Sequence, residues 1–101
     1  MNEPLPPVFE GLLDEAGFEA LLRDLASCAV VHEVRVRGDC PNPLRNDPIE
    51  LHDAAERFRQ GNARGLQIRY EHEGALWCDT LSRTSAGIRV VRVRQPAKQG
   101  S

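Results

Sequence analysis

The sequence has few aromatic residues and no strong excess of either charge. Aromatic residues make up 5% of its 101 residues, with one tryptophan and one tyrosine, and the formal net charge is −2. A balanced charge gives no overall attraction to nucleic acid or to an anionic membrane. No apolar run reaches the roughly 18 residues that a membrane-spanning helix needs. The first residues lack the cationic region and apolar core of a secretory signal, so we expect a cytoplasmic protein.

Cysteine is also scarce, and its spacing argues against disulfides and metal sites. Cys28, Cys40 and Cys78 form an odd, widely spaced set, which is atypical of a disulfide framework and predicts free, buried thiols. Cys28 and His32 are the only close pair of potential metal ligands, and no CxxC, HxxxH or HExxH motif occurs. The chain also lacks a GxSxG motif and a phosphate-binding glycine loop before a helix. We therefore predict no catalytic residues, no metal and no cofactor, with a metal-dependent enzyme as the third-ranked function.

Two segments have the periodicity of amphipathic helices. From Phe18 to Leu25, apolar residues recur at positions i, i+3, i+4 and i+7, and Asp14 is the expected N-cap. In the second segment, residues 47–50 (Asp-Pro-Ile-Glu) provide a carboxylate cap, a proline at the first helical position and a glutamate at the third. This capping box predicts a helix over residues 48–60, which Gly61 ends by adopting positive φ.

The remaining patterned segments are expected to be strands. Residues 30–37 alternate with period two, and residues 64–72, 75–83 and 87–95 follow the second helix as a meander. An antiparallel sheet with both helices on one face buries these apolar stripes most simply. We therefore predict a single α+β domain over residues 1–101, with a four-stranded, mainly antiparallel sheet and the element order α-β-α-β-β-β. Its ends, residues 1–8 and 96–101, are expected to be loosely ordered, and the place of the first strand in the sheet stays open.

The turn near residue 73 decides which face of the sheet each side chain takes, because a shift of one residue flips them all. A two-residue turn at Glu73-Gly74 requires positive φ at a glutamate, which is unfavourable. A three-residue loop from His72 to Gly74 requires positive φ only at the glycine. We therefore predict the three-residue loop, which places Arg69 opposite Trp77.

This register divides the strands between an inner face, under the helices, and an outer face. The residues predicted to be inner are Leu66, Ile68, Tyr70, Leu76, Cys78, Val91 and Val93. If residues 84–87 close the next hairpin, Asp79 lies opposite Arg92 and Trp77 opposite Arg94. The predicted binding site is an outer-face cluster of five residues: Arg69, Trp77, Asp79, Arg92 and Arg94.

An exposed tryptophan among arginines is typical of a protein-binding hot spot, and Leu81 and Val90 are expected to extend the apolar area around it. Strand 88–93, with valines on both sides, also favours pairing with a second copy. We therefore expect a small, non-enzymatic binding domain that contacts a protein partner, or self-associates as a homodimer, through the outer sheet face. A simpler interpretation is that these residues only stabilise a solvated sheet through cross-strand contacts.

The alternative function is a nucleic-acid-binding module that uses the same face. Arginines on several strands would contact phosphates, and Trp77 would offer a plane on which a base stacks. The acidic net charge and the single candidate aromatic residue on this face disfavour nucleic acid.

Overall fold

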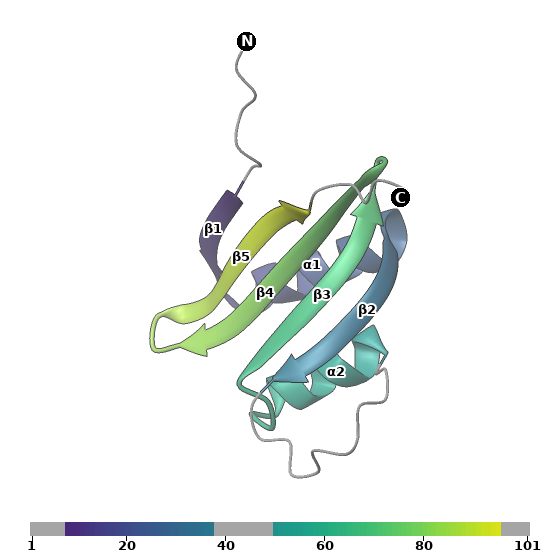
Figure 1. Ribbon diagram of the computed structural model, residues 1–101. Coiled ribbons are helices and arrows are strands. Elements are labelled where there is room, and N and C mark those ends of the chain that lie inside the picture. Colours follow the sequence, from purple (N-terminus) through teal and green to yellow (C-terminus); the bar gives the residue numbers. More distant parts are fainter. Residues whose placement is uncertain (1–7, 38–49, 96–101) are drawn as a thin grey trace.

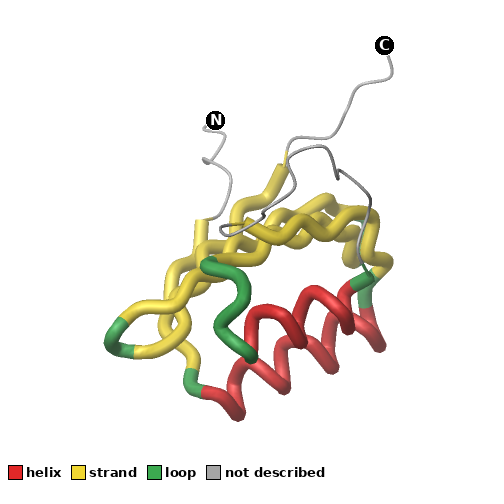
Figure 2. The backbone as a smooth tube through the Cα atoms, turned by 90° about the horizontal axis from the view of Figure 1, so that it is seen from below, coloured by secondary structure: helices red, strands yellow, loops and turns green. Residues whose placement is uncertain are grey.

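The computed structural model describes residues 8–37 and 50–95, which form one sheet layer and one helix layer (Figures 1 and 2). The elements in chain order are β1 (Val8–Leu13), α1 (Glu15–Cys28), β2 (Val30–Arg37), α2 (Leu51–Arg59), β3 (Gly65–His72), β4 (Ala75–Thr84) and β5 (Gly87–Gln95). Both helices lie on the same face of the sheet, behind it in Figure 1. The predicted class is confirmed: an α+β fold with an antiparallel sheet and two helices on one face.

The sheet has five strands in the order β1-β5-β4-β3-β2, and each neighbouring pair is antiparallel. The chain enters at the β1 edge, crosses beneath the sheet through α1 to the β2 edge, and returns through the meander β3-β4-β5 (Figure 1). The first predicted strand, β2, pairs with β3 and carries a β-bulge between Val31 and Glu33. The two edges of the sheet are therefore β1 and β2.

The predicted count of four strands is wrong because β1 precedes the first helix. β1 pairs with β5 along its whole length, from Val8 opposite Val93 to Leu13 opposite Ile88. Its sequence, VFEGLL, hides a strand because Glu10-Gly11 interrupts the apolar alternation; a strand this short forms where a neighbour offers a pairing edge. The predicted pairing of strand 88–93 with a second copy is also wrong, since β5 lies between β1 and β4.

Both predicted helices are present. The Asp14 carboxylate accepts a hydrogen bond of 2.8 Å from the Gly17 amide, which confirms this cap, and α1 buries Phe18 and Leu25. α2 begins at Leu51, and Glu50 is its N-cap in an extended conformation, so the predicted start at residue 48 and the place of Glu50 at the third helical position are wrong. Residues 47–49 of the predicted capping box lie outside the described residues. Gly61 has a φ of +79°, the positive value predicted for the residue that ends this helix.

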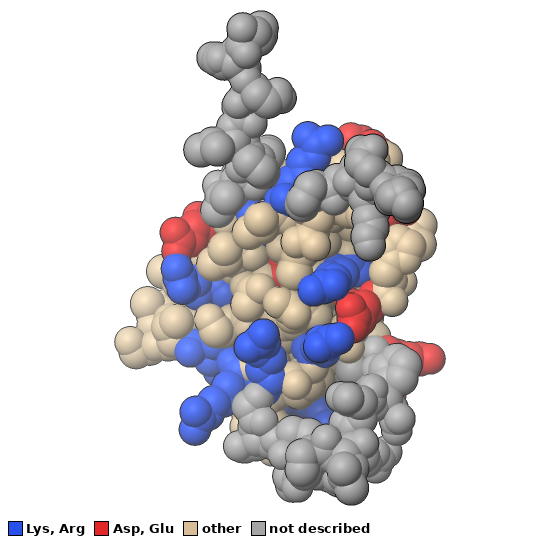
Figure 3. All heavy atoms as spheres, in the orientation of Figure 1, with Lys and Arg blue, Asp and Glu red and all other residues tan. Residues whose placement is uncertain are grey.

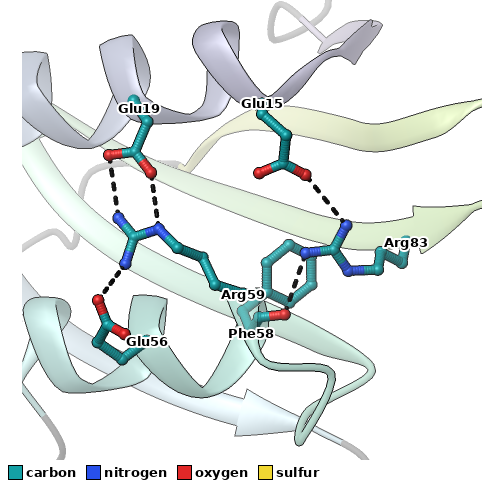
Figure 4. A network of polar contacts seen from close by, with 6 residues as sticks. All are labelled: Glu15, Glu19, Glu56, Phe58, Arg59 and Arg83. Carbon is teal, nitrogen blue, oxygen red and sulfur yellow. Dashed lines mark hydrogen bonds and ion pairs between the residues drawn. The ribbon is translucent and has the colours of Figure 1, made fainter.

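An arginine joins the two helices across their polar surface (Figure 4). Arg59 on α2 donates hydrogen bonds of 2.6 and 3.0 Å to the two carboxylate oxygens of Glu19 on α1, and one of 2.6 Å to Glu56. Its guanidinium lies 5.8 Å from the ring centroid of Phe18, which packs against Phe58 with ring centroids 5.3 Å apart. The ion pair of Arg59 with Glu19 therefore lies against the fully buried aromatic pair of Phe18 and Phe58.

A second arginine ties the sheet to the same helix pair. Arg83 on β4 donates to the Phe58 carbonyl oxygen at 3.1 Å and to Glu15 at 3.4 Å (Figure 4). Its guanidinium lies 4.8 Å from the Phe58 ring centroid. The carbonyl is near the C-terminus of α2, where a cation is favoured by the helix dipole.

The register between β3 and β4 differs from the predicted one. His72 pairs with Ala75, so the turn contains only Glu73 and Gly74, with φ of +53° and +79°. Two positive φ values define a type I′ turn, which matches the twist of the flanking strands. The left-handed conformation costs a glutamate about 1–2 kcal/mol. A slip of one residue would expose Leu81, whose burial alone contributes about 1.5–3 kcal/mol.

The corrected register exchanges the two faces of β4 and β5. Leu81 is fully buried under the helices and Val90 packs against the same core, although both were predicted to face outward. The four residues predicted to be inner that lie instead on the face without helices are Leu76, Cys78, Val91 and Val93. The inner positions predicted on β3 are confirmed, because Leu66, Ile68 and Tyr70 are in the core.

We expect Glu19→Gln to lower stability at pH 7 but not in acid. Hydrogen bonds from Arg59 lower the pKa of Glu19 below its ordinary value of 4.5. A lowered pKa means that the carboxylate stabilises the folded state above pH 4.5 and that this contribution disappears as the pH falls through the lowered value. The urea midpoints of wild type and variant should differ at pH 7 and converge towards pH 3. A constant difference, such as a purely steric effect would give, contradicts this account.

We expect Glu73→Asn to stabilise the protein by up to about 1 kcal/mol, because asparagine tolerates the left-handed conformation better than glutamate. Thermal and urea unfolding of the variant measure this gain. Glu73→Val is the matched opposite, since a β-branched side chain at positive φ should lower stability. Equal stability of the two variants would mean that the turn does not hold this geometry in solution.

Candidate functional site

The predicted binding residues divide between the two faces of the sheet. Asp79 pairs with Arg92 and Trp77 with Arg94, so this part of the predicted register is confirmed. These four residues lie on the helix-covered side, because Trp77 pairs with Tyr70 of the core rather than with Arg69. Arg69 lies on the opposite face. The expected outer-face cluster is therefore wrong as a single surface.

Asp79 is a buried carboxylate with three hydrogen-bond donors. It has no exposed surface, and Arg92 donates to its two oxygens at 2.9 and 2.8 Å while the Tyr70 hydroxyl donates at 3.0 Å. Burying an unpaired carboxylate lowers the free energy of unfolding by roughly several kcal/mol. A guanidinium that binds both carboxylate oxygens offsets much of that cost. The side chain of Arg92 is 35% exposed, so the pair lies where the core meets solvent.

The two hydrogen-bond donors to Asp79, Arg92 and Tyr70, each keep one protonation state at neutral pH and are not poised for proton transfer. Its hydrogen bonds with Asp79 raise the pKa of Arg92, and burial, with the neighbouring Asp79 carboxylate, raises the pKa of Tyr70. At neutral pH the arginine is therefore charged and the tyrosine hydroxyl keeps its proton. General acid–base catalysis favours groups whose pKa lies near the working pH. The arrangement is suited to holding strands β3, β4 and β5 together.

Trp77 packs between the core and the exposed end of β1. It is partly buried against the core cluster, and its ring centroid lies 6.5 Å from that of Phe9, which is 57% exposed. Arg94 is exposed on the neighbouring strand. The indole therefore contributes mainly to packing, and the hot spot predicted around it is not part of an open sheet surface.

The helix-free face is the larger candidate surface, and Figure 3 shows it directly. We define the helix-free face as the side of the sheet that no helix covers among the described residues. Its side chains include Glu10, Leu12, Glu33, Arg35, Arg37, Gln67, Arg69, Glu71, Leu76, Cys78, Thr80, Ser82, Arg89, Val91, Val93 and Gln95. An apolar strip crosses its centre on β4 and β5, formed by Leu76, Cys78, Val91 and Val93.

Arginines border this apolar strip on both sides. On one side Arg89 contacts Glu10, and on the other Arg35 and Arg69 contact the same carboxylate, that of Glu33, at 2.7 and 3.7 Å. Hydrogen bonding to Arg35 lowers the pKa of Glu33, so the carboxylate is ionised at neutral pH. A guanidinium has five N–H groups and these contacts engage only one in each arginine. The described residues of this face therefore offer more donors than acceptors.

The described part of the chain contains neither a cluster of metal ligands nor a helix that could span a membrane. Within residues 8–37 and 50–95, no group of three or more His, Cys, Asp or Glu side chains is placed to hold a metal ion. Cys28 and Cys78 are free thiols, and the predicted burial is confirmed for Cys78 but wrong for Cys28, which is exposed. None of the described helices has the length and apolar character needed to cross a bilayer.

Comparisons of the chain with protein-family models, with curated proteins and with solved structures give no match. The candidate site therefore depends on the geometry of this chain. The sequence prediction missed the apolar strip because it gave the turn between β3 and β4 three residues, whereas the turn has two. The alternation of side chains around Leu81 and Ile88 would have revealed the strip. Both residues must point to the helix-covered side if β4 and β5 are to pack against the helices.

We expect Arg92→Met to destabilise the protein by about 3 kcal/mol, because it leaves the Asp79 carboxylate buried with a single donor. Tyr70→Phe removes one hydrogen bond and should cost about 1 kcal/mol. Urea unfolding at pH 7 measures both values.

Arg94→Met is the control, since this exposed arginine lies on the same strand and face and should have almost no effect. The double variant Asp79→Leu/Arg92→Met should recover most of the loss, because an apolar pair removes the unpaired charge. Equal stabilities of the Arg92→Met and Arg94→Met variants would show that the buried pair does not contribute to folding.

Proposed function

We propose that the protein is a non-enzymatic binding domain whose helix-free face docks on an acidic, partly apolar surface of a protein partner. The observation that carries this proposal is an apolar strip, half-buried apart from the buried Cys78, on the sheet face that no described helix covers, bordered by arginines whose contacts with described residues leave N–H donors unused. Apolar patches rimmed by polar groups are typical of protein-binding sites. A cytoplasmic location remains part of the proposal.

The charge on the face favours a partner that brings carboxylates. The glutamates of this face are already engaged: Glu10 by Arg89, Glu33 by two arginines, and Glu71 by His32 at 3.3 Å. The guanidinium donors that these contacts leave unused are available to a partner, and bidentate arginine–carboxylate contacts supply both energy and orientation. A partner with acidic residues around an apolar centre fits both parts of the surface.

Protein is favoured over nucleic acid because the helix-free face has no aromatic residue. The five aromatic residues of the chain lie in the core or on the helix-covered side: Phe9, Phe18, Phe58, Tyr70 and Trp77. Single-stranded nucleic acids are held largely by stacking on aromatic rings. The stacking argument for nucleic acid therefore has no support on this surface, whereas the aliphatic strip suits a protein.

The test is a selection of random peptides displayed on phage against the wild-type chain. We expect enriched peptides to combine aspartate or glutamate with leucine, isoleucine, valine or phenylalanine. Binding of the enriched peptides should fall at least tenfold for Arg69→Glu and for the double variant Val91→Thr/Val93→Thr, which keeps the β-branched shape.

Arg23→Glu is the matched control, because it makes the same charge change on an exposed position of α1 and should leave peptide binding unchanged. If Arg23→Glu and Arg69→Glu weakened peptide binding equally, the effect would come from net charge alone, and the proposal would be overturned. Failure to enrich acidic peptides, together with salt-dependent binding of single-stranded RNA, would favour the nucleic-acid alternative instead.

A further inference from the structure

The two edges of the sheet differ in how well they are protected against pairing with another strand. Exposed edges are usually blocked by bulges, prolines or charged side chains, lysine above all. β2 has a bulge between Val31 and Glu33 and carries Arg35 and Arg37 beyond it. β1 (VFEGLL) has no proline, lysine or arginine, and it runs in continuous register with β5. β1 is therefore the unprotected edge.

β1 also exposes apolar side chains on both of its faces. Phe9 on the helix-covered side and Leu12 on the helix-free face are each 57% exposed. The one charged residue of the strand, Glu10, is engaged by Arg89 of the neighbouring strand. An edge with an apolar side chain above and below its backbone gains both hydrogen bonds and apolar contacts when another strand adds to it.

We propose that a second copy of the chain adds to this edge, with the two β1 strands antiparallel about a twofold axis at Gly11. In this register Phe9 lies opposite the partner's Leu13 on the helix-covered side, and Glu10 lies opposite the partner's Leu12 on the other. A Cβ built on Gly11 has no atom within 4 Å, so no described side chain lies over the sheet face at the proposed axis.

The other registers that keep side chains on their proper faces are less favourable. An axis at Glu10 would set two carboxylates directly opposite each other, which destabilises an antiparallel pair. An axis at Phe9 or Leu12 would pair fewer residues of the strand Val8–Leu13. The axis at Gly11 pairs five residues from each copy and sets no like charges opposite one another.

A second copy fits this edge better than an unrelated strand because the pairing closes on itself. A twofold contact uses the same surface of both molecules and leaves no further β1 edge free. The outermost strands of the joined sheet are then the two β2 strands, whose bulge and charges resist additional pairing. The unprotected edge thus leads to a dimer rather than to a fibre.

The dimer places both helix-free faces on the same side of one continuous sheet, because a twofold axis perpendicular to the sheet preserves its faces. The pairing itself does not depend on the docking proposed above. If both hold, the dimer presents two apolar strips to a single partner or to two linked sites, which raises the apparent affinity without any new contact.

The test is the mass of the full chain in solution, measured by light scattering and sedimentation over a wide concentration range. Wild type should show twice the chain mass of 11.3 kDa at high concentration. Leu12→Glu places a carboxylate opposite the partner's Glu10 and should give a monomer. Leu12→Lys sets an opposite charge there and should remain a dimer, which tests the register. Amide hydrogen exchange should show that protection of β1 increases with protein concentration in wild type. The Leu12→Glu variant should show no such increase.

Val30→Glu is the control on the other edge, where a 60% exposed valine becomes a glutamate and the mass should not change. Urea unfolding confirms that each variant is folded. A wild-type monomer at every concentration overturns the proposal, as does a dimer that Leu12→Glu leaves intact or Val30→Glu dissociates. Peptide binding by a monomeric Leu12→Glu variant would leave the docking proposal standing, so the two proposals can fail separately.

Discussion

The two-residue turn at Glu73-Gly74 determines the chemistry of both faces of the sheet. Side chains alternate strictly along a strand, so the number of residues in this turn decides whether Trp77 and Asp79 face the helices or solvent. With two residues at positive φ, Leu81 meets the helices and the apolar strip faces outward. The strain at a single glutamate is smaller than the apolar burial that the register secures, and the tertiary packing therefore overrides the local preference.

The same register creates the main electrostatic requirement of the core. It brings Asp79 into the helix-covered side, where a carboxylate is stable only with partners. The chain meets this requirement with residues from the two neighbouring strands: Arg92 on β5 and the hydroxyl of Tyr70 on β3. The Arg92 contacts require the observed register of β4 and β5, and the Tyr70 contact requires that of β3 and β4, so the buried charge disfavours a slip of either pair. It contributes more to the uniqueness of the pairing than to a reactive site.

The sequence predicted the parts of the fold that depend on local chemistry. The Asp14 cap, the positive φ of Gly61 and the hairpin from Thr84 to Gly87 each follow from residues that are close in the chain, and each is present. The parts that failed depend on distant partners. β1 forms a strand because it pairs with β5. Glu73 adopts positive φ because only the two-residue turn places Leu81 in the core under the helices. The predicted placement of the five site residues on one outer face is wrong for the second reason, although their pairings across β4 and β5 are correct.

The composition of the helix-free face is consistent with the reversible docking that we propose for it. Both helices lie on the opposite side, so the described residues leave this face without a cover. An obligate interface resembles a core, whereas here Thr80 lies between Val91 and Gln67, and ion pairs lie on both sides of the apolar strip. Such a mixture tolerates water in the free state and still offers aliphatic contact to a partner. The β1 edge differs, because its exposed backbone groups lie between two exposed apolar side chains, so an added strand would replace hydrogen bonds to water and bury apolar surface at the same time. The two proposals therefore depend on different chemistry, apolar contact and arginine donors on the face and strand pairing at the edge.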